Sequence, residues 1–143
     1  MNLYGLEFHH FGLAVKSPEA AFRYLDDLGY GAGSTCYDPL QKVNLAMRHH
    51  DQMPDVEVIW PGAEPSPIDG MLQRSNCMIY HLCYTSEDVE RSVAALEQAG
   101  LEVLPLGLAQ PALLFDGLEV SFYSISGVGI IEIIAGMPAR RIS

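Results

Sequence analysis

Basic residues are scarce in this chain. Only 8 Lys and Arg stand against 18 Asp and Glu among its 143 residues, which gives a formal net charge of −10. A nucleic-acid-binding protein needs a basic stripe that displaces counterions from phosphate, and here only Arg140 and Arg141 are adjacent. The same scarcity argues against attraction to an anionic membrane surface. We therefore expect neither a nucleic acid nor a membrane as a partner.

Cysteine and long apolar runs are also scarce. The three cysteines, Cys36, Cys77 and Cys83, form no C-x-x-C motif, and their odd number argues against a disulfide scaffold or a cysteine-rich zinc site. The longest uncharged apolar stretch, Val120 to Ile131, is too short to span a bilayer. The first ten residues do not have the pattern of a secretory signal. We therefore expect a cytoplasmic protein, since free thiols suit a reducing compartment.

What the chain does have is apolar material for a core. Hydrophobic residues make up 49% of it and charged residues 18%, which is typical of a globular protein and not of a disordered one. The length suits one domain, and we expect a single domain over residues 1–143. We expect Arg140–Ser143 to form a loose tail.

A weak internal duplication is the main organising feature. His10 and His81 are 71 residues apart, and so are Gly29 and Gly100. A strand pattern surrounds each His, and a helical pattern precedes each Gly. We infer two modules of similar construction, too few for a solenoid. Module one covers about 7–61, a linker covers 62–76, and module two covers about 77–136.

The first module reads as strand, helix and further strands. Alternation over Phe8–Val15 predicts a strand with His10 on one face and His9 on the other. We expect Ser17 to cap a helix that has Pro18 at its first position and ends at Gly29. The remaining expectations are strands over 43–47 and 56–60, a polar connection at 49–55 with solvated His49 and His50, and one or two helical turns at 68–74.

The second module repeats this order. We expect a strand over 78–84, a helix that begins at Ser86 and reaches Gly100, and strands near 101–104, 118–125 and 129–134. Two crossover helices among many strands predict an α+β domain. We expect a curved sheet with each helix on its outer face.

Four side chains of the metal-binding type stand in apolar strand patterns. His10 and His81 lie in the first strand of each module, and Glu57 and Glu132 lie in the last. A carboxylate among β-branched residues must face solvent, pair with a cation or bind a metal, because burial without a partner is costly. Two His and two Glu that meet in a concavity would form a site for a first-row divalent metal. Taken singly, each His could instead be a hydrogen-bonded structural residue and each Glu a solvent-facing one.

These residues lie in segments that resemble a known family. The segments are His10–Val15, Val56–Pro61, Tyr80–Tyr84 and Ile130–Ile133. They resemble the vicinal oxygen chelate superfamily, which includes glyoxalase I, methylmalonyl-CoA epimerase, extradiol dioxygenases and bleomycin-resistance proteins. The resemblance covers residues 7 to about 136 and implies paired βαβββ modules that form a cup around one metal ion.

The resemblance also implies a site and a reaction. His10, Glu57, His81 and Glu132 match the four ligand positions, and two His with two Glu are similar to the ligand set of bacterial glyoxalase I. The implied cofactor is one divalent ion: zinc, nickel, cobalt or manganese. The implied activity is that of an isomerase or lyase which stabilises an enolate of a carbonyl or acyl-thioester substrate, with Glu57 or Glu132 as both ligand and base. Among family members the chain is most similar to methylmalonyl-CoA epimerase-like proteins, because Glu57–Pro61 followed by Ser66–Ile68 and a short helix resembles the end of their first module. Family members usually form homodimers.

One departure from the family concerns Asn44. Epimerases place a second catalytic Glu in the strand before the second ligand, and Asn44 stands at the matching place. Because an amide is not a base near neutral pH, two-base epimerisation is in doubt. We expect Asn44, Gln41, Asp38 and Tyr123 as possible substrate contacts, although Asp38 suits a turn and Tyr123 suits the core. Cys83 lies two residues after His81, so we expect both side chains on the same face of the strand.

Three alternatives remain open. The ligand set also suits a glyoxalase I-like lactoylglutathione lyase. A small-molecule-binding protein of the bleomycin-resistance type would keep the fold without the chemistry. An extradiol oxygenase is disfavoured, because its iron uses two His and one carboxylate and a fourth ligand would crowd the oxygen position.

Overall fold

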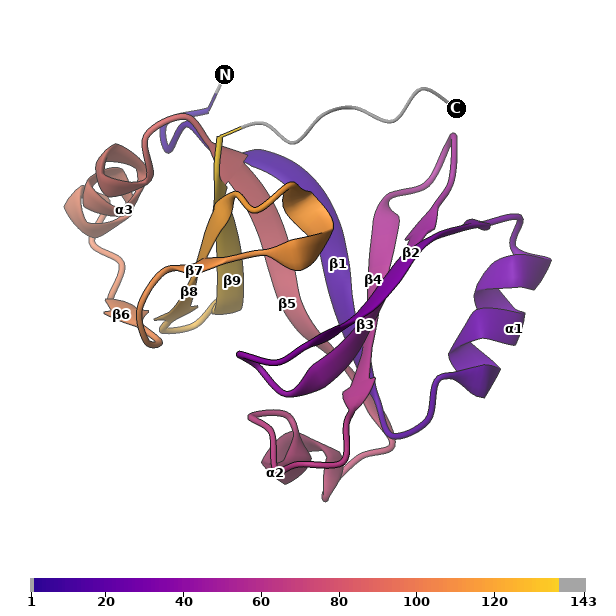
Figure 1. Ribbon diagram of the computed structural model, residues 1–143. Helices are drawn as coiled ribbons and strands as arrows, with labels where there is room; N and C mark the ends of the chain where they lie inside the picture. The colour runs from indigo at the N-terminus through magenta and orange to yellow at the C-terminus, as the bar shows by residue number, and fades with distance from the viewer. Residues whose placement is uncertain (1, 137–143) are drawn as a thin grey trace. The chain divides into compact units, whose positions relative to one another are not determined.

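The computed structural model describes residues 2–136, whose course Figure 1 shows. The predicted tail at 140–143 lies outside the described residues. The elements are β1 (Glu7–Val15), α1 (Glu19–Asp27), β2 (Gly31–Asp38), β3 (Val43–His49), β4 (Asp55–Pro61), α2 (Asp69–Leu72), β5 (Cys77–Ser86), α3 (Val89–Gln98), β6 (Val103–Pro105), β7 (Gln110–Pro111), a 3₁₀ helix (Leu113–Phe115), β8 (Glu119–Ile125) and β9 (Gly129–Ala135). No helix in the described part of the chain is long and apolar enough to cross a membrane.

The two modules have the same topology. In module one the strand order is β2-β3-β4-β1, and β1 runs parallel to β4. In module two the order is β5-β9-β8-β6, β5 runs parallel to β9, and β7 pairs with β8. Figure 1 shows α1 beside the strands of module one and α3 beside those of module two. The predicted α+β class with paired βαβββ modules is confirmed.

The chain forms two compact units whose boundaries fall inside strands. One unit spans His10–Tyr80, and the other combines the chain up to His9 with the chain from His81 onward. Tyr4 and Leu6 accordingly pack in the core of module two. The N-terminal segment therefore contributes to the module that follows it much later in sequence.

In module one, α1 covers one face of the strands. Leu25 and Phe22 of the helix pack with Val15 of β1 and with Val58 and Trp60 of β4. Because side chains alternate along a strand, the opposite face of β1 and β4 bears His10 and Glu57. We call this second face the His10/Glu57 face.

Module two repeats the arrangement. Leu96 of α3 packs with Ile125 of β8 and with Ile131 and Ile133 of β9, and Tyr123 lies against this cluster. Glu132, between two of these isoleucines, consequently points to the face away from α3.

The two long helices begin later than the sequence predicts. The Pro18 carbonyl accepts the first helical hydrogen bond, from Phe22 N, and no side chain caps α1, so the predicted Ser17 cap is wrong. Ser86 ends β5, and the Asp88 carboxylate caps α3 by accepting a hydrogen bond from Arg91 N at 3.1 Å.

The helix ends follow the prediction. Gly29 and Gly100 follow α1 and α3 with φ of +95° and +89°, values that favour glycine after a helix C-cap. The short helix expected within 68–74 is also present, as α2.

The strand β2 escapes sequence prediction. Its residues, Gly31 to Asp38, are mostly small and lack a periodic apolar pattern. The strand lies at the edge of module one, and its register with β3 shifts between Ala32 and Thr35. An exposed edge strand with an irregular register carries little of the alternation on which sequence prediction depends.

Candidate functional site

The first candidate pair lies on two neighbouring parallel strands of module one. Glu57 on β4 is in register with Gly12 on β1, two residues after His10. His10 is fully buried and Glu57 is 4% exposed. His10 Nε2 lies 3.8 Å from Glu57 Oε1. The structure therefore brings together the two residues that the sequence singles out in this module.

The second candidate pair occupies the equivalent strands of module two. Glu132 on β9 is in register with Cys83 on β5, two residues after His81. Both side chains are buried, and His81 Nε2 lies 3.4 Å from Glu132 Oε1. Each module thus places a Glu opposite the second residue after its His. This identical register is strong support for a duplicated module.

The donor atoms in each pair suit a divalent metal ion. An imidazole nitrogen and a carboxylate oxygen are ligands of zinc and related first-row metals. Both N–O distances are longer than a well-formed N–H···O hydrogen bond. Two ligand atoms about 2.1 Å from one metal ion lie roughly 3.0–3.4 Å apart. Each pair therefore fits the role of two neighbouring ligands with little change.

The structure does not bring Asn44 to Glu57. Asn44 is in register with Trp60, which packs on the α1 side, whereas Met47 is in register with Glu57. The Asn44 side-chain amide donates to the Pro61 carbonyl at 3.3 Å. The β3 residues on the His10/Glu57 face near Glu57 are the buried Leu45 and Met47. This part of β3 thus presents apolar side chains where an epimerase base is expected.

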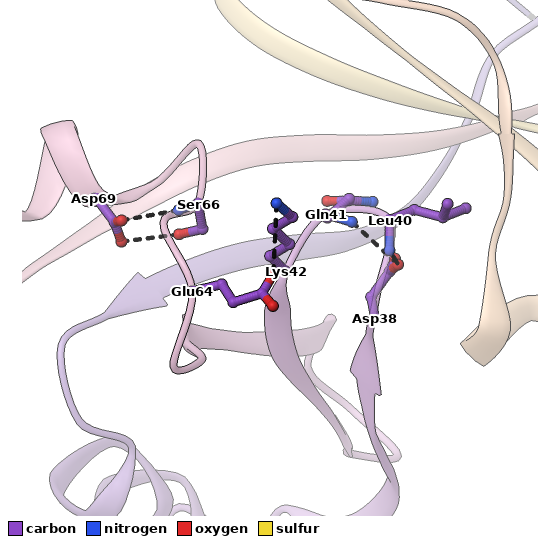
Figure 2. Close-up of polar contacts among 7 residues, drawn as sticks. All are labelled: Asp38, Leu40, Gln41, Lys42, Glu64, Ser66 and Asp69. Carbon is purple, nitrogen blue, oxygen red and sulfur yellow. Dashed lines mark hydrogen bonds and ion pairs between the residues drawn. The ribbon is translucent and has the colours of Figure 1, made fainter.

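Asp38 and Gln41 belong to the turn between β2 and β3 (Figure 2). The buried Asp38 Oδ1 accepts hydrogen bonds from Leu40 N at 2.8 Å and Gln41 N at 3.2 Å. Asp38 O accepts a third from Lys42 N, which has a φ of +60°. The Asp38 carboxylate therefore stabilises this turn, as the simpler interpretation of its sequence predicts.

On β8, Phe122 and not the predicted Tyr123 lies on the Glu132 face of module two. Tyr123 is in register with Ile131 and packs on the α3 side. Phe122 is in register with Glu132, and its ring meets His81 edge-on at 5.3 Å. Cys83 is fully buried beside Glu132, as its parity predicts. An alternation argument extended to β8 would have identified Phe122.

A second imidazole–carboxylate pair, missed by sequence reasoning, lies in module one. His49 Nδ1 and Asp55 Oδ2 are 2.9 Å apart, and each side chain is just under a third exposed. Asp55 is in register with His10 on β1. The prediction of a solvated His49 is therefore wrong. The sequence signal for this pair was the spacing of Asp55 and Glu57, which are two residues apart and therefore lie on the same face of one strand.

One thiol also lies on the His10/Glu57 face. Cys36 on β2 is in register with Leu45, which is in register with Ile59. Burial raises the pKa of the Cys36 thiol, and the negative charges of Asp38 and Glu57 raise it further. Cys36 is therefore held in its neutral form and is a weak nucleophile.

Comparisons with known proteins place this geometry in context. The model of the Glyoxalase/Bleomycin resistance protein/Dioxygenase superfamily matches residues 9–122. A search of curated proteins found no match.

Solved structures share the fold over most of the chain. Methylmalonyl-CoA epimerase from Mycobacterium tuberculosis has a TM-score of 0.73 at 21% identity, covering 94% of this chain and 89% of that one. A hypothetical protein from Bacillus halodurans has a TM-score of 0.75 at 20% identity, covering 96% and 99%. A methylmalonyl-CoA epimerase in complex with methylmalonyl-CoA and NH4+ has a TM-score of 0.72 at 18% identity, covering 92% and 94%.

Proposed function

We propose that this chain, which belongs to the glyoxalase/bleomycin resistance protein/dioxygenase superfamily, is a divalent-metal-dependent isomerase or lyase that acts on a carbonyl compound or an acyl thioester. The observation that carries the proposal is the buried His–Glu pair repeated at the same strand register in both modules. Burial of two carboxylates among apolar residues costs free energy. Their presence at equivalent positions of both modules is therefore best explained by a function that needs them.

The proposed cofactor is one divalent ion held by all four residues. His10 and Glu57 would supply two ligands, and His81 and Glu132 the other two. Two imidazoles and two carboxylates carry a charge of −2, which balances the charge of zinc, nickel, cobalt or manganese. When bound, the ion would supply a Lewis acid for a substrate oxygen.

Glu57 and Glu132 have a second proposed role as proton acceptors. A carboxylate that gives up its ligand position regains a free lone pair. It would take the proton from the carbon next to the substrate carbonyl and return it to the same or to the neighbouring carbon. Return to the same carbon on the opposite face of the enolate inverts its configuration, and return to the neighbouring carbon completes an isomerisation.

The acyl-thioester class is supported by the structures that share this fold. They include methylmalonyl-CoA epimerases in complex with methylmalonyl-CoA and with 2-nitronate-propionyl-CoA. A lyase of the glyoxalase type is the second candidate. It is favoured by the apolar β3 face beside Glu57, where Leu45 and Met47 leave no second carboxylate for two-base epimerisation. We also propose a homodimer, which light scattering after gel filtration would test.

Elemental analysis followed by proton exchange tests the proposal. Untagged protein is expected to contain close to one equivalent of a first-row divalent metal per chain. In its presence, deuterium from solvent should enter the carbon next to a carbonyl in a panel of acyl thioesters and hemithioacetals. Failure to retain zinc, nickel, cobalt or manganese would contradict the metal site. Tight metabolite binding unaffected by His81→Ala would instead indicate a binding protein.

A further inference from the structure

Asp55 is a partly exposed carboxylate on the His10/Glu57 face. It is in register with His10, so both side chains point to the same face of neighbouring strands. Glu57 follows two residues later on the same strand and is buried, whereas the Asp55 side chain is 29% exposed. Of His10, Glu57 and Asp55, only Asp55 has enough exposed surface for an incoming ligand to contact it.

The Asp55 carboxylate is held by His49. The His49 ring lies between Asp55 Oδ2, 2.9 Å from its Nδ1, and the backbone of Gly33. A Cβ at Gly33 would lie only 2.7 Å from His49 Nε2, so the absence of a side chain there leaves room for the ring. The ring is thus fixed from both sides, and it fixes one oxygen of Asp55.

Apart from His10 and His49, no basic side chain in the described strands lies on the His10/Glu57 face beside Asp55. In the described part of the chain, Arg48 is the only Lys or Arg within a strand. Its guanidinium lies 4.1 Å from the centre of the Phe22 ring, on the α1 side of module one. The other described basic residues lie in helices or loops: Lys16, Arg23, Lys42, Arg74 and Arg91. Lys42, in the β2–β3 turn, faces Glu64 at 3.4 Å.

These observations bear on which substrates the site accepts. A fixed carboxylate accepts hydrogen bonds from hydroxyl or amine groups. It repels a substrate carboxylate, and like charges brought together disfavour the wrong ligand strongly. A site that recognised a free carboxylate would be expected to present Arg or Lys toward it.

We propose that Asp55 is a substrate-contacting residue, and that it selects a carbonyl compound with a hydroxyl group on the α-carbon over one with a carboxylate there. His49 is its positioning residue. The inference rests on the proposed function and narrows its substrate class.

Two matched thioesters test the inference. The 2-hydroxypropionyl and methylmalonyl thioesters of N-acetylcysteamine differ at the α-carbon only in hydroxyl against carboxylate. Solvent-deuterium exchange is measured for each with the metal-loaded protein and is divided by the uncatalysed rate. The wild-type ratio of kcat/KM is expected to favour the hydroxyl compound by at least about 10-fold. Asp55→Asn should reduce this ratio about 10-fold by removing the repulsion.

Variants of His49 separate positioning from folding. His49→Gln keeps a side-chain donor near Asp55 and should retain most of the wild-type ratio. His49→Leu removes the donor and should raise KM for the hydroxyl compound several-fold with little change in kcat. Asp51→Asn removes an equal charge from the exposed β3–β4 loop and serves as the matched control. Its ratio should equal that of the wild type.

A spectroscopic control shows that Asp55→Asn is folded. Burial raises the pKa of Tyr30, and the charge of Asp55 raises it further. An NMR pH titration that follows the Tyr30 ring, one of seven tyrosine rings in the chain, should therefore show a lower Tyr30 pKa that remains above the ordinary value.

The outcomes distinguish this inference from the proposed function. Exchange of the methylmalonyl compound as fast as the hydroxyl compound, with no effect of Asp55→Asn, would overturn the inference and leave the proposed function standing. Exchange of neither compound, in protein that retains no metal, would overturn both.

Discussion

The Glu132 carboxylate lies 3.4 Å from the His81 imidazole, and both groups are nearly inaccessible to solvent. The Phe122 ring meets the His81 ring edge-on, and the fully buried Cys83 lies beside Glu132. His10 and Glu57 form the equivalent pair at 3.8 Å. Two such pairs in one small chain point to a retained chemical role, because apolar residues would fill the same positions at lower cost.

Loss of one ligand is expected to weaken metal binding at least about 100-fold, since even groups that only support a ligand contribute 10- to 100-fold. The variants are His81→Ala and Glu132→Gln, and the measurement is competition with a coloured chelator. His50→Ala serves as the control, because the His50 ring accepts hydrogen bonds from Gln52 N and Met53 N in the β3–β4 loop. Full metal affinity in Glu132→Gln would contradict the assignment.

Metal removal should also lower the thermal midpoint. A ligand present at 100 times its Kd stabilises the folded state by about 2.7 kcal/mol. Addition of a chelator to the wild type should therefore lower Tm by several degrees. The same chelator should leave the Tm of His81→Ala unchanged. An equal decrease in both proteins would mean that the chelator acts elsewhere.

Apolar replacement of one pair should separate stability from function. Removing one partner of a buried pair costs about 3–5 kcal/mol, whereas replacing both with apolar residues is neutral or stabilising by about 1–4 kcal/mol. In the presence of a chelator, Glu57→Leu alone should therefore be less stable to urea than the double variant His10→Leu with Glu57→Leu. A double variant less stable than the single one would show that the pair itself stabilises the metal-free fold.

Alternation along strands made much of the candidate site predictable. The patterns around His10 and His81 each place one proposed ligand on the face away from a helix, and the structure shows these two faces. The pattern is reliable there because the opposite face is covered by apolar helix side chains. The same reasoning would have excluded Asn44, had the register of β3 with β4 been known.

The features that could not be predicted from the sequence depend on contacts between strands and on where the strands end. His49 and Asp55 stand in a polar segment that resembles a solvated loop, yet they end β3 and begin β4 and meet across the turn. The helix start at Asp88 was misassigned to Ser86 for a related reason. Both residues can cap a helix, and only the extension of β5 to Ser86 decides between them.

Loss of the α3 cap is expected to destabilise module two. Asp88→Ala removes the carboxylate that accepts from Arg91 N, and such a loss typically costs about 1 kcal/mol. Urea unfolding at neutral pH measures the change. Glu87→Ala, which removes the neighbouring exposed charge, is the matched control and should change the free energy of unfolding by less than about 0.5 kcal/mol. A similar loss in both variants would assign the effect to net charge and not to the cap.

Alkaline pH should act on the fold through Cys36. Its raised pKa arises first from burial and then from Asp38 and Glu57, so the folded state holds the thiol proton more tightly than the unfolded state does. The resulting stabilisation is complete below the ordinary thiol pKa and is lost as pH rises through the folded-state pKa. The free energy of unfolding of the wild type should therefore fall more steeply than that of Cys36→Ser as pH rises from about 8 to about 10. This range extends about one unit on either side of the ordinary thiol pKa of 9.0. Iodoacetamide should modify the exposed Cys77 before Cys36 at every pH in this range. Parallel pH profiles for the two proteins, or earlier modification of Cys36, would show that the thiol is not held in its neutral form.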